Sequence, residues 1–385
     1  MKYYLIAGEP SGDALGGRLM DAIRRKDKKA EFFGIGGDSM QAHGLKSLFN
    51  ISELAVMGFA EVLPSIPRIL RRIRETMQNI AEVKPDAVIT IDSWSFSARI
   101  HKKLRRLNLH IPQIHYVAPQ VWAWKKKRAR TMYKYIDLLL TLFPNEPRYF
   151  TPYHLHSEFV GHPVIESLIV NASQEKNTFR KEHKIPAKKR IMLVLPGSRH
   201  NEVERLLPDF LQVVEKMQTK YKDFAFVIPT VSTVADRVKS MVSAARLPIV
   251  VVEGEEERRK AFQNAEVAIA ASGTVALELA IVGIPHIIAY KVPKLTEWLV
   301  RRFIHIQYVN LTNILLGREI VPELLQQDCT PDNILNYVDQ FVARKDLYAH
   351  QMKGFADVRR VLGFGKQTPS DNAAAAILKI VKTRR

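Results

Sequence analysis

The chain holds a single cysteine, Cys329, among its 385 residues. One thiol excludes a disulfide within the chain and a metal cluster of cysteine thiolates, which fits a reducing compartment. No window approaches about 18 uninterrupted apolar residues, so we expect no membrane-spanning helix. The opening run MKYYLIAGEPSGD turns charged at Glu9 and indicates a strand, not a signal peptide. The sequence therefore predicts a cytoplasmic protein.

The sequence also lacks a dinucleotide-binding glycine fingerprint. In IAGEPSGDALGG (6–17) the glycines do not have the G-x-G-x-x-G spacing, and GIGGDS (34–39) does not supply it. Glu9 and Asp13 would repel a pyrophosphate, so this turn better suits a sugar hydroxyl or a proton transfer. No Asp-x-Asp metal motif is evident, and we expect neither a metal nor a cofactor. The residues of this turn that we expect at the substrate are Ser11, Gly12 and Asp13.

Acidic residues are few: the chain has 39 Asp and Glu against 58 Lys and Arg, and its formal net charge is +19. Such a surface favours a polyanion, an anionic membrane or phosphorylated substrates, unless the host's proteins are all basic. The run HYVAPQVWAWKKKRAR (115–130) could stack nucleic-acid bases. Its tryptophans are equally a wall for a sugar or a packing anchor. Gln120 in this run is a candidate binding residue.

Apolar strand-like runs alternate with amphipathic helical stretches along almost the whole chain, which indicates parallel sheets covered by helices. The pattern restarts after the polar stretch 171–189. We therefore predict an α/β protein of two Rossmann-like domains facing a cleft. A helix near 370–383 could fold back over the first domain. The predicted parts are an acceptor-side domain (1–170), a nucleotide-sugar domain (171–350) and a C-terminal helical segment (351–385).

Two strand–helix turns of the second half are candidate anion sites, because ligands of doubly wound sheets bind beyond the carboxyl ends of the strands. LPGSRHNEV (195–203) combines helix-start amides with a fixed positive charge, and ASGTVALE (271–278) opens a helix after an apolar strand. Each is alternatively an ordinary turn or capped helix, but the pair favours a nucleotide diphosphate. The candidate residues are Gly197, Ser198, Arg199, Glu202, Ser272, Gly273, Thr274 and, for the ribose, Glu278.

Asp92 ends the apolar run AVITID. A carboxylate at the edge of a buried strand can have a raised pKa and act as a general base. The alternative is a structural aspartate that caps the following helix.

Residues 61–77, EVLPSIPRILRRIRETM, place apolar side chains along one helical face and arginines on the remainder. This pattern is typical of a helix in an anionic bilayer surface, and also of a core-facing helix. The residues that we expect to face the membrane are Val62, Leu63, Ile66, Ile69, Leu70 and Ile73.

Together these segments resemble the lipid-A-disaccharide synthase family, glycosyltransferase family 19 of the GT-B superfamily, over nearly the whole chain. The segments occur in the family's order, and the ordered set is far more specific than any one of them. They are AGEPSGD (7–13), ELAVMGFAEVLP (53–64), IHYVAPQVWAW (114–124), FVGHP (159–163), LPGSRHNEV (195–203), ASGTVALE (271–278) and TNILLGREIVPELLQ (312–326).

The resemblance implies transfer of 2,3-diacylglucosamine from UDP to the 6-hydroxyl of 2,3-diacylglucosamine 1-phosphate, at an anionic inner-membrane surface. It ties Asp92 and Arg199 to activity and places Glu9 and Asn313 near the site. Asp92 is our first choice for the base and Glu9 the second. The family usually continues the aspartate motif with proline, whereas Trp94 follows Asp92 and a serine here. We expect this bulky ring to reshape the acceptor side.

Rival interpretations are another UDP-sugar enzyme such as a UDP-GlcNAc 2-epimerase, an inactive homologue, and a basic nucleic-acid-binding protein. We expect no nucleic-acid partner, because that interpretation leaves the two anion turns without a role. A homodimer stays open.

Overall fold

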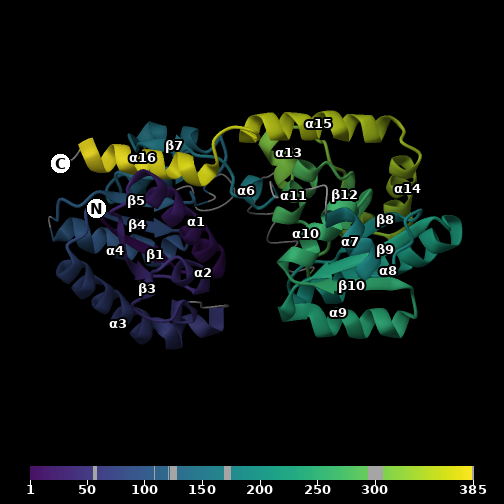
Figure 1. Ribbon diagram of the computed structural model, residues 1–385, viewed down its shortest axis with the longest axis horizontal. Coiled ribbons are helices and arrows are strands. Elements are labelled where there is room, and N and C mark those ends of the chain that lie inside the picture. The colour runs from purple at the N-terminus through teal and green to yellow at the C-terminus, as the bar shows by residue number, and fades with distance from the viewer. Residues whose placement is uncertain are drawn as a thin grey trace. The chain divides into compact units, whose positions relative to one another are not determined.

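The computed structural model describes residues 1–54, 59–107, 109–119, 121, 128–168, 175–293 and 307–383. The chain forms two compact units (Figure 1). Unit 1 comprises Met1–Pro163 with Gly365–Arg385, and unit 2 comprises Val164–Phe364. Among the described helices none has the length and apolarity to cross a membrane.

Unit 1 is built on a seven-stranded parallel sheet in the order β3-β2-β1-β4-β5-β6-β7. The chain leaves β1 toward one edge and returns to the other side of β1 with β4, where Ala7 pairs with Ile91. The turns after β1 and β4 therefore lie together at a topological switch point. The strands are β1 (Lys2–Ala7), β2 (Glu31–Ile35), β3 (Lys46–Ser47), β4 (Ala87–Ile91), β5 (Gln113–Tyr116), β6 (Leu138–Thr141) and β7 (Ser157–Phe159).

Helices cover both faces of this sheet, so its central strands are apolar on both sides. Tyr3, Leu5 and Ala7 belong to the core under α1 and α16, whereas Tyr4 and Ile6 belong to the core under α3 and α4. The helices are α1 (Pro10–Lys26), α2 (Asp38–Ala42), α3 (Phe59–Val83), α4 (Trp94–Arg106), α5 (Ala129–Met132) and α16 (Pro369–Thr383). Short 3-10 turns are η1 (Ile51–Leu54), η3 (Pro147–Tyr149) and η4 (Thr151–Tyr153).

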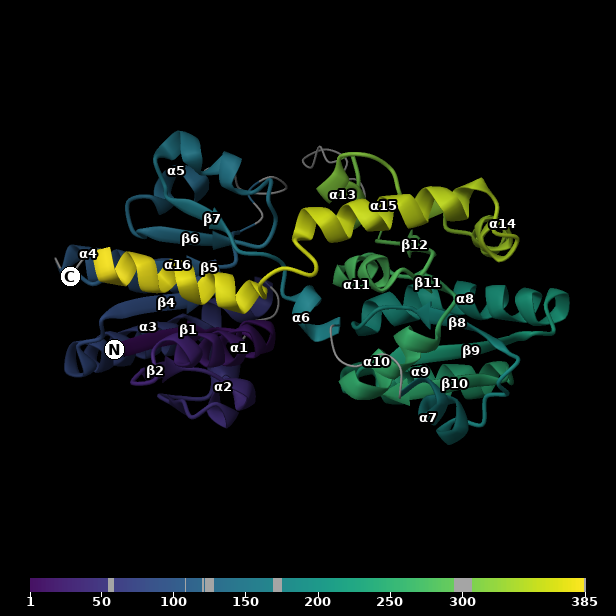
Figure 2. The same ribbon diagram turned by 45° about the horizontal axis from the view of Figure 1, so that its top comes forward.

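The C-terminal helix belongs to unit 1, as we predicted for residues 370–383. Figure 2 shows α16 on the sheet face that also carries α1. Ala373, Ile377 and Val381 are buried in the shared core. At its start, Asn372 Nδ2 donates a hydrogen bond to the carbonyl of Val160 at 3.0 Å.

Unit 2 repeats the same plan with a six-stranded parallel sheet in the order β10-β9-β8-β11-β12-β13. Leu195 at the end of β8 pairs with Ala270 at the end of β11, so the two predicted anion turns are neighbours. The strands are β8 (Arg190–Leu195), β9 (Phe224–Thr230), β10 (Ile249–Glu253), β11 (Val267–Ala270), β12 (His286–Tyr290) and β13 (Glu323–Leu325).

One core of unit 2 lies under α8, α9 and α14, and a second lies under α7, α10, α11 and α15. The helices are α6 (Val164–Leu168), α7 (Glu175–Glu182), α8 (His200–Lys220), α9 (Ser232–Ala245), α10 (Glu255–Asn264), α11 (Thr274–Val282), α13 (Leu311–Leu316), α14 (Pro331–Val342) and α15 (Asp346–Leu362), with the 3-10 turn η5 (Gln326–Asp328).

The unit boundaries differ from the predicted residues 170/171 and 350/351. The chain enters unit 2 at Val164, because α6 packs on α11. It leaves only after Phe364, because α15 is part of the unit 2 core. The side chain of Gln351 bonds both to the amide of His286 at 3.0 Å and to its carbonyl at 2.8 Å. The predicted boundary at 350/351 therefore falls inside α15 and separates Gln351 from the sheet to which it is bonded.

Candidate active site

Glu9 and Asp92 follow the paired strands β1 and β4. Asp92 and Ser93 both have left-handed backbones, with φ of 56° and 43°. In this turn the Ser93 amide donates to Asp92 Oδ1 at 2.7 Å and the Ser93 hydroxyl donates to Glu9 Oε1 at 3.1 Å. One serine thus bonds to both carboxylates that we proposed as bases.

Burial raises the pKa of the Asp92 carboxyl, the bond from the Ser93 amide opposes the rise, and the negative charge of Glu9 adds to it. A carboxylate with a raised pKa binds a proton more readily than an ordinary aspartate at the same pH. This electrostatic setting suits the role of general base, which remains a prediction for Asp92.

A cavity of about 440 Å³, the unit 1 cavity, opens beside Asp92. It collects side chains from the ends of β4, β5 and β6, as expected for a doubly wound sheet. Our sequence reasoning placed only Asp92 and Trp94 here and missed the other polar members. The lining residues are Asp92, Trp94, His115, Val117, Ala118, Pro119, Arg128, Leu142, Phe143 and Glu146.

Glu146 is the second acid of the unit 1 cavity and is only 3% exposed. Its Oε2 accepts hydrogen bonds from the amides of Leu142 and Phe143, each at 3.0 Å. Burial raises the pKa of Glu146 to about 7, against the opposing effect of those two amides. The available signal was an acid shortly after the apolar run DLLLTLF, at the carboxyl end of a predicted strand.

Trp94 forms a wall of the unit 1 cavity. Its ring contacts the ring of His115 edge to face, with centroids 4.8 Å apart, and lies 6.2 Å from the ring of His101. The departure from the family pattern therefore places an aromatic ring beside buried histidines on the side that we assigned to the acceptor.

Asp13 does not present its carboxylate to a ligand, contrary to our expectation. It is 5% exposed, and Oδ1 accepts from the amides of Gly37 at 2.7 Å and Met40 at 3.0 Å. Its Oδ2 accepts from the amide of Ser39 at 2.9 Å. Asp13 therefore anchors the start of α2, where three amide donors need an acceptor.

The glycines of the opening turn are also packed against the protein, not against an open space. A Cβ on Gly8 would lie 2.7 Å from Ser93 Cβ, and one on Gly12 would lie 3.2 Å from the carbonyl oxygen of Ile91. They let the turn and the start of α1 approach the end of β4, so Gly12, which we expected at the substrate, is a packing residue. Of the substrate residues predicted in this turn, Ser11 is the exposed one.

The two anion turns of unit 2 share a second cavity of about 340 Å³, the unit 2 cavity. The structure thus brings together the residues that we predicted to bind a nucleotide diphosphate, apart from Glu278. The lining residues are Leu195, Gly197, Ser198, Arg199, Glu202, Pro229, Thr230, Val231, Arg258, Ala271, Ser272, Gly273, Thr274 and Val275.

Within the first turn, an internal carboxylate occupies the amides that we assigned to a phosphate. Glu202 Oε2 accepts from the amides of Ser198 at 3.1 Å and Arg199 at 3.3 Å. Gly197 has φ of +111°, and a Cβ there would lie 2.4 Å from Glu202 Oε2. The Arg199 side chain is 78% exposed and bonds Glu202 Oε1 through Nη1 at 2.8 Å. The guanidinium, and not the amides, is therefore the part of this turn available to an anion.

The start of α11 is open. Among the described residues no side chain caps this nine-residue helix, and a Cβ on Gly273 would meet nothing within 4 Å. Ser272 donates to the carbonyl of Val309 at 3.2 Å. Thr230, 4% exposed, lines the same cavity, and its hydroxyl has no hydrogen-bond partner in the described part of the chain. An anion fits this helix start, where free amides and the helix dipole act together.

Glu278 and Asn313 are held by the protein's own groups. Glu278 Oε2 pairs with Arg258 Nη1 at 2.6 Å. Asn313 is fully buried, and its amide bonds Glu323 Oε1 and the carbonyl of Val321, both at 2.8 Å. Its carbonyl oxygen accepts from the amide of Ile320 at 2.7 Å. Asn313 therefore joins α13 to the β13 segment, which corrects its placement at the substrate.

The apolar stripe of α3 divides in the structure. Ile66 and Leu70 are 41% and 53% exposed, whereas Ile73 is 1% exposed and Ile69 packs partly against the core. Ile73 therefore does not face a membrane, contrary to our expectation. The side chains of residues 62 and 63 and the whole of residue 120, also predicted for the site, lie outside the described residues.

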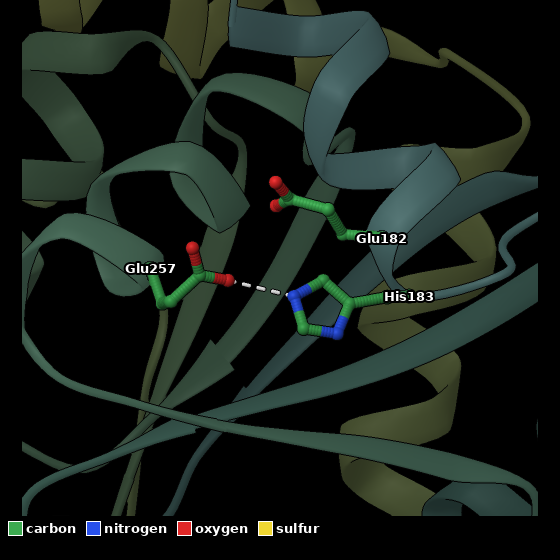
Figure 3. A group of neighbouring side chains, drawn as sticks. All are labelled: Glu182, His183 and Glu257. Atoms are coloured by element: carbon green, nitrogen blue, oxygen red, sulfur yellow. Dashed lines mark hydrogen bonds and ion pairs between the residues drawn. The ribbon is translucent and has the colours of Figure 1, made fainter.

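Among the described residues one group has the spacing of a metal site, formed by Glu182, His183 and Glu257 (Figure 3). His183 Nε2 and Glu257 Oε2 are 2.6 Å apart. Lys260 Nζ lies 3.0 Å from Glu257 Oε1 and 3.8 Å from a Glu182 oxygen. An internal ammonium thus already balances these carboxylates, and none of the four residues lines either cavity.

Comparison with solved structures supports the fold. The chain matches a UDP-GlcNAc 2-epimerase from Neisseria meningitidis bound to UDP-GlcNAc over 100% of both chains, with a TM-score of 0.65 at 14% identity. It matches MurG from Acinetobacter baumannii over 99% of both chains, with a TM-score of 0.56 at 14% identity. These likenesses confirm the predicted GT-B fold of two α/β domains.

Comparison with sequence families and curated relatives is more specific. A family model described as "Lipid-A-disaccharide synthetase" matches residues 3–377. The lipid-A-disaccharide synthase of Rhodospirillum centenum is 46% identical over 99% of this chain and 95% of the relative. The lipid-A-disaccharide synthase of Paramagnetospirillum magneticum is 45% identical over 99% of this chain and 98% of the relative. The chain therefore belongs to the lipid-A-disaccharide synthetase family, a family of glycosyltransferases.

Proposed function

We propose that this glycosyltransferase of lipid A biosynthesis condenses UDP-2,3-diacylglucosamine with 2,3-diacylglucosamine 1-phosphate. The acceptor 6-hydroxyl attacks the anomeric carbon, a new C–O bond forms with inversion, and the bond to the UDP oxygen breaks. The products are the β-1′,6-linked disaccharide 1-phosphate and UDP. The proposal rests on one observation in a chain of this family. One cavity contains a carboxylate with a raised pKa, and the other contains an open helix start beside an arginine.

The nucleotide is assigned to the unit 2 cavity. Its diphosphate meets the uncapped start of α11 and the exposed guanidinium of Arg199. The Glu202 side chain is hydrogen-bonded to this guanidinium and fixes its direction. Both features stabilise the negative charge that develops on the departing UDP.

The acceptor sugar is assigned to the unit 1 cavity. Asp92 takes the proton of the 6-hydroxyl as the new bond forms, since burial and the nearby Glu9 charge make its carboxylate more basic. Glu9 is exposed and shares Ser93 with Asp92, so it is the second candidate for this proton.

The acylated substrates call for a membrane surface, and α3 supplies a suitable helix face. Ile66 and Leu70 are exposed apolar side chains, and Arg68, Arg71 and Arg74 beside them are exposed. Apolar residues rimmed by arginines favour an anionic bilayer. We assign the protein to the cytoplasmic face of the inner membrane as a peripheral protein.

The decisive experiment incubates the purified protein with both diacylated substrates in detergent and follows UDP release and disaccharide by mass spectrometry. We expect equal amounts of the two products. UDP-GlcNAc conversion without any disaccharide would instead support the epimerase interpretation and overturn the proposal.

A further inference from the structure

A chain of buried polar side chains leads into the unit 1 cavity. Gln113 Oε1 lies 2.8 Å from His101 Nδ1, and His101 Nε2 lies 2.8 Å from the Thr90 hydroxyl. The same hydroxyl lies 2.7 Å from His115 Nδ1. All four side chains are fully buried, and only His115 lines the cavity.

The chain fixes the position of each proton. The Gln113 carbonyl oxygen can only accept, so His101 Nδ1 carries a hydrogen and its Nε2 is a lone pair. Thr90 has one hydroxyl hydrogen, and His101 Nε2 at 2.8 Å is a nearer acceptor for it than the carbonyl of Ile114 at 3.5 Å. With that hydrogen on the bond to His101, the Thr90 oxygen accepts from His115 Nδ1. His115 Nε2 is then a lone pair. Burial lowers the pKa of His101 to about 4. Burial and the neighbouring His101 lower the pKa of His115 well below its ordinary value. Both rings are therefore neutral.

Within the described part of the chain, no group donates a hydrogen bond to the lone pair of His115. Nε2 is buried and has no hydrogen-bond partner among the described residues, although the ring borders the unit 1 cavity. A buried acceptor left unpaired is costly. The geometry therefore points to a ligand donor in the cavity that also holds Asp92.

Glu146 also lines this cavity, but its Oε2 already accepts the amides of Leu142 and Phe143, and burial raises its pKa to about 7. The other two lining groups that can accept a proton or a hydrogen bond from a sugar are the Asp92 carboxylate and His115 Nε2. Once positions 1, 2 and 3 of the acceptor are substituted, its free hydroxyls are those on C4 and C6. These hydroxyls are close together on the sugar, and both acceptor residues line the same cavity. The 6-hydroxyl reacts and goes to Asp92, which leaves the 4-hydroxyl for the histidine.

We propose that His115 Nε2 accepts a hydrogen bond from the 4-hydroxyl of the acceptor sugar, with its tautomer set by Gln113, His101 and Thr90. This inference rests on the proposed function. His115 is then a binding residue that orients the acceptor while Asp92 receives the proton of the reacting hydroxyl. Trp94, edge-on to the His115 ring at 4.8 Å, holds that ring in place.

The test is a double-mutant cycle between the protein and the substrate. His115→Asn keeps an amide near the Nδ1 position for Thr90 and removes the Nε2 acceptor. With the normal acceptor, we expect the KM for the acceptor to rise roughly tenfold and the KM for the UDP-sugar to stay unchanged. A 4-deoxy acceptor should cost wild-type protein the same factor and cost the His115→Asn variant nothing further.

A matched control is His286→Asn in unit 2. His286 is also fully buried, and its Nε2 is also unpaired among the described residues, but it lines neither cavity. We expect no change in the KM for the acceptor. An equal rise in this control would show that loss of a buried histidine, not of a ligand contact, produces the effect.

Two further measurements decide the outcome if His115→Asn does not fold. The ¹⁵N spectrum of the wild-type histidines should show His115 protonated on Nδ1 and bare on Nε2. Thr90→Val, which keeps the shape but frees the tautomer, should weaken the preference for the 4-hydroxyl. The opposite tautomer, or additive losses in the cycle, would overturn the inference. Wild-type protein that makes no disaccharide would instead refute the proposed function.

Discussion

Replacing Glu146 by glutamine tests whether the unit 1 cavity holds a neutral acid. In the folded protein burial raises the pKa of Glu146 from its ordinary 4.5 to about 7, although the amides of Phe143 and Leu142 oppose the rise. The folded state therefore binds this proton more tightly than the unfolded chain does. The resulting stabilisation is present below pH 4.5 and is lost as the pH rises through about 7.

The size of the effect follows from the two pKa values. They differ by about 2.5, and each pKa unit corresponds to ~1.36 kcal/mol, so ionising Glu146 costs the fold about 3 kcal/mol. Glutamine is neutral at every pH and offers one oxygen to the amides of Leu142 and Phe143, as the protonated acid does. We expect the variant to equal wild type near pH 4.5 and to be more stable by about 3 kcal/mol near pH 8.

Urea unfolding, followed by circular dichroism and by tryptophan fluorescence at several pH values, measures this difference. The matched control is Glu158→Gln, an acid of the adjacent strand β7 that is half-buried. This control shows how much of the pH dependence any partly buried acid of the same sheet would produce. If the free-energy difference between Glu146→Gln and wild type is the same at pH 4.5 and pH 8, Glu146 is not a neutral acid in the folded protein.

Three further variants test the proposed roles. Asp92→Asn should lower kcat by roughly 10²- to 10⁴-fold and remove the rise of kcat/KM with pH, since the neutral amide takes no proton; wild-type rates would move the base elsewhere. Arg199→Ala should lower kcat by roughly 10²-fold with an unchanged melting temperature, because the side chain is 78% exposed. Changing Ile66 and Leu70 to serine should weaken binding to phosphatidylglycerol vesicles by roughly 100-fold. Leu107→Ser is the control, because Leu107 is an even more exposed apolar residue outside α3, and equal losses would refute the assignment of α3.

Sequence periodicity was sufficient for the sheets because their central strands are buried on both faces. Runs such as AVITID and VAIAAS appear in the structure as β4 and β11. The short strands β3, β7 and β13 have no comparable apolar run. The domain boundary near residue 350 was misplaced for a similar reason, since nothing in the sequence of α15 indicates that Gln351 bonds to the backbone of a distant strand.

The sequence motifs located the turns but did not show which group each side chain binds. Asp13 and Asn313 fall on motif positions, yet their oxygens are bonded to backbone amides. Glu202 occupies the amides that we assigned to a phosphate. Such partners come from backbone groups, which every residue carries, so residue types do not reveal them. Glu146 was missed because it lies in none of the recognised segments. His115 was missed although it lies in IHYVAPQVWAW, because it is a residue of strand β5 itself and not of the turn that follows.

The two cavities use one topology for opposite electrostatic purposes. In each unit the chain reverses direction beside its first strand, and two adjacent turns open at the carboxyl edge. In unit 1 Asp92 follows β4 at this point and Glu146 follows β6 farther along the same edge, and burial raises the pKa of both, so the cavity favours proton acceptance. In unit 2 an internal carboxylate fills one turn and leaves the other helix start uncapped beside Arg199, so the cavity favours an anion. Transfer of a sugar from a diphosphate to a hydroxyl needs both properties, and a protein that only binds nucleotides needs only the second.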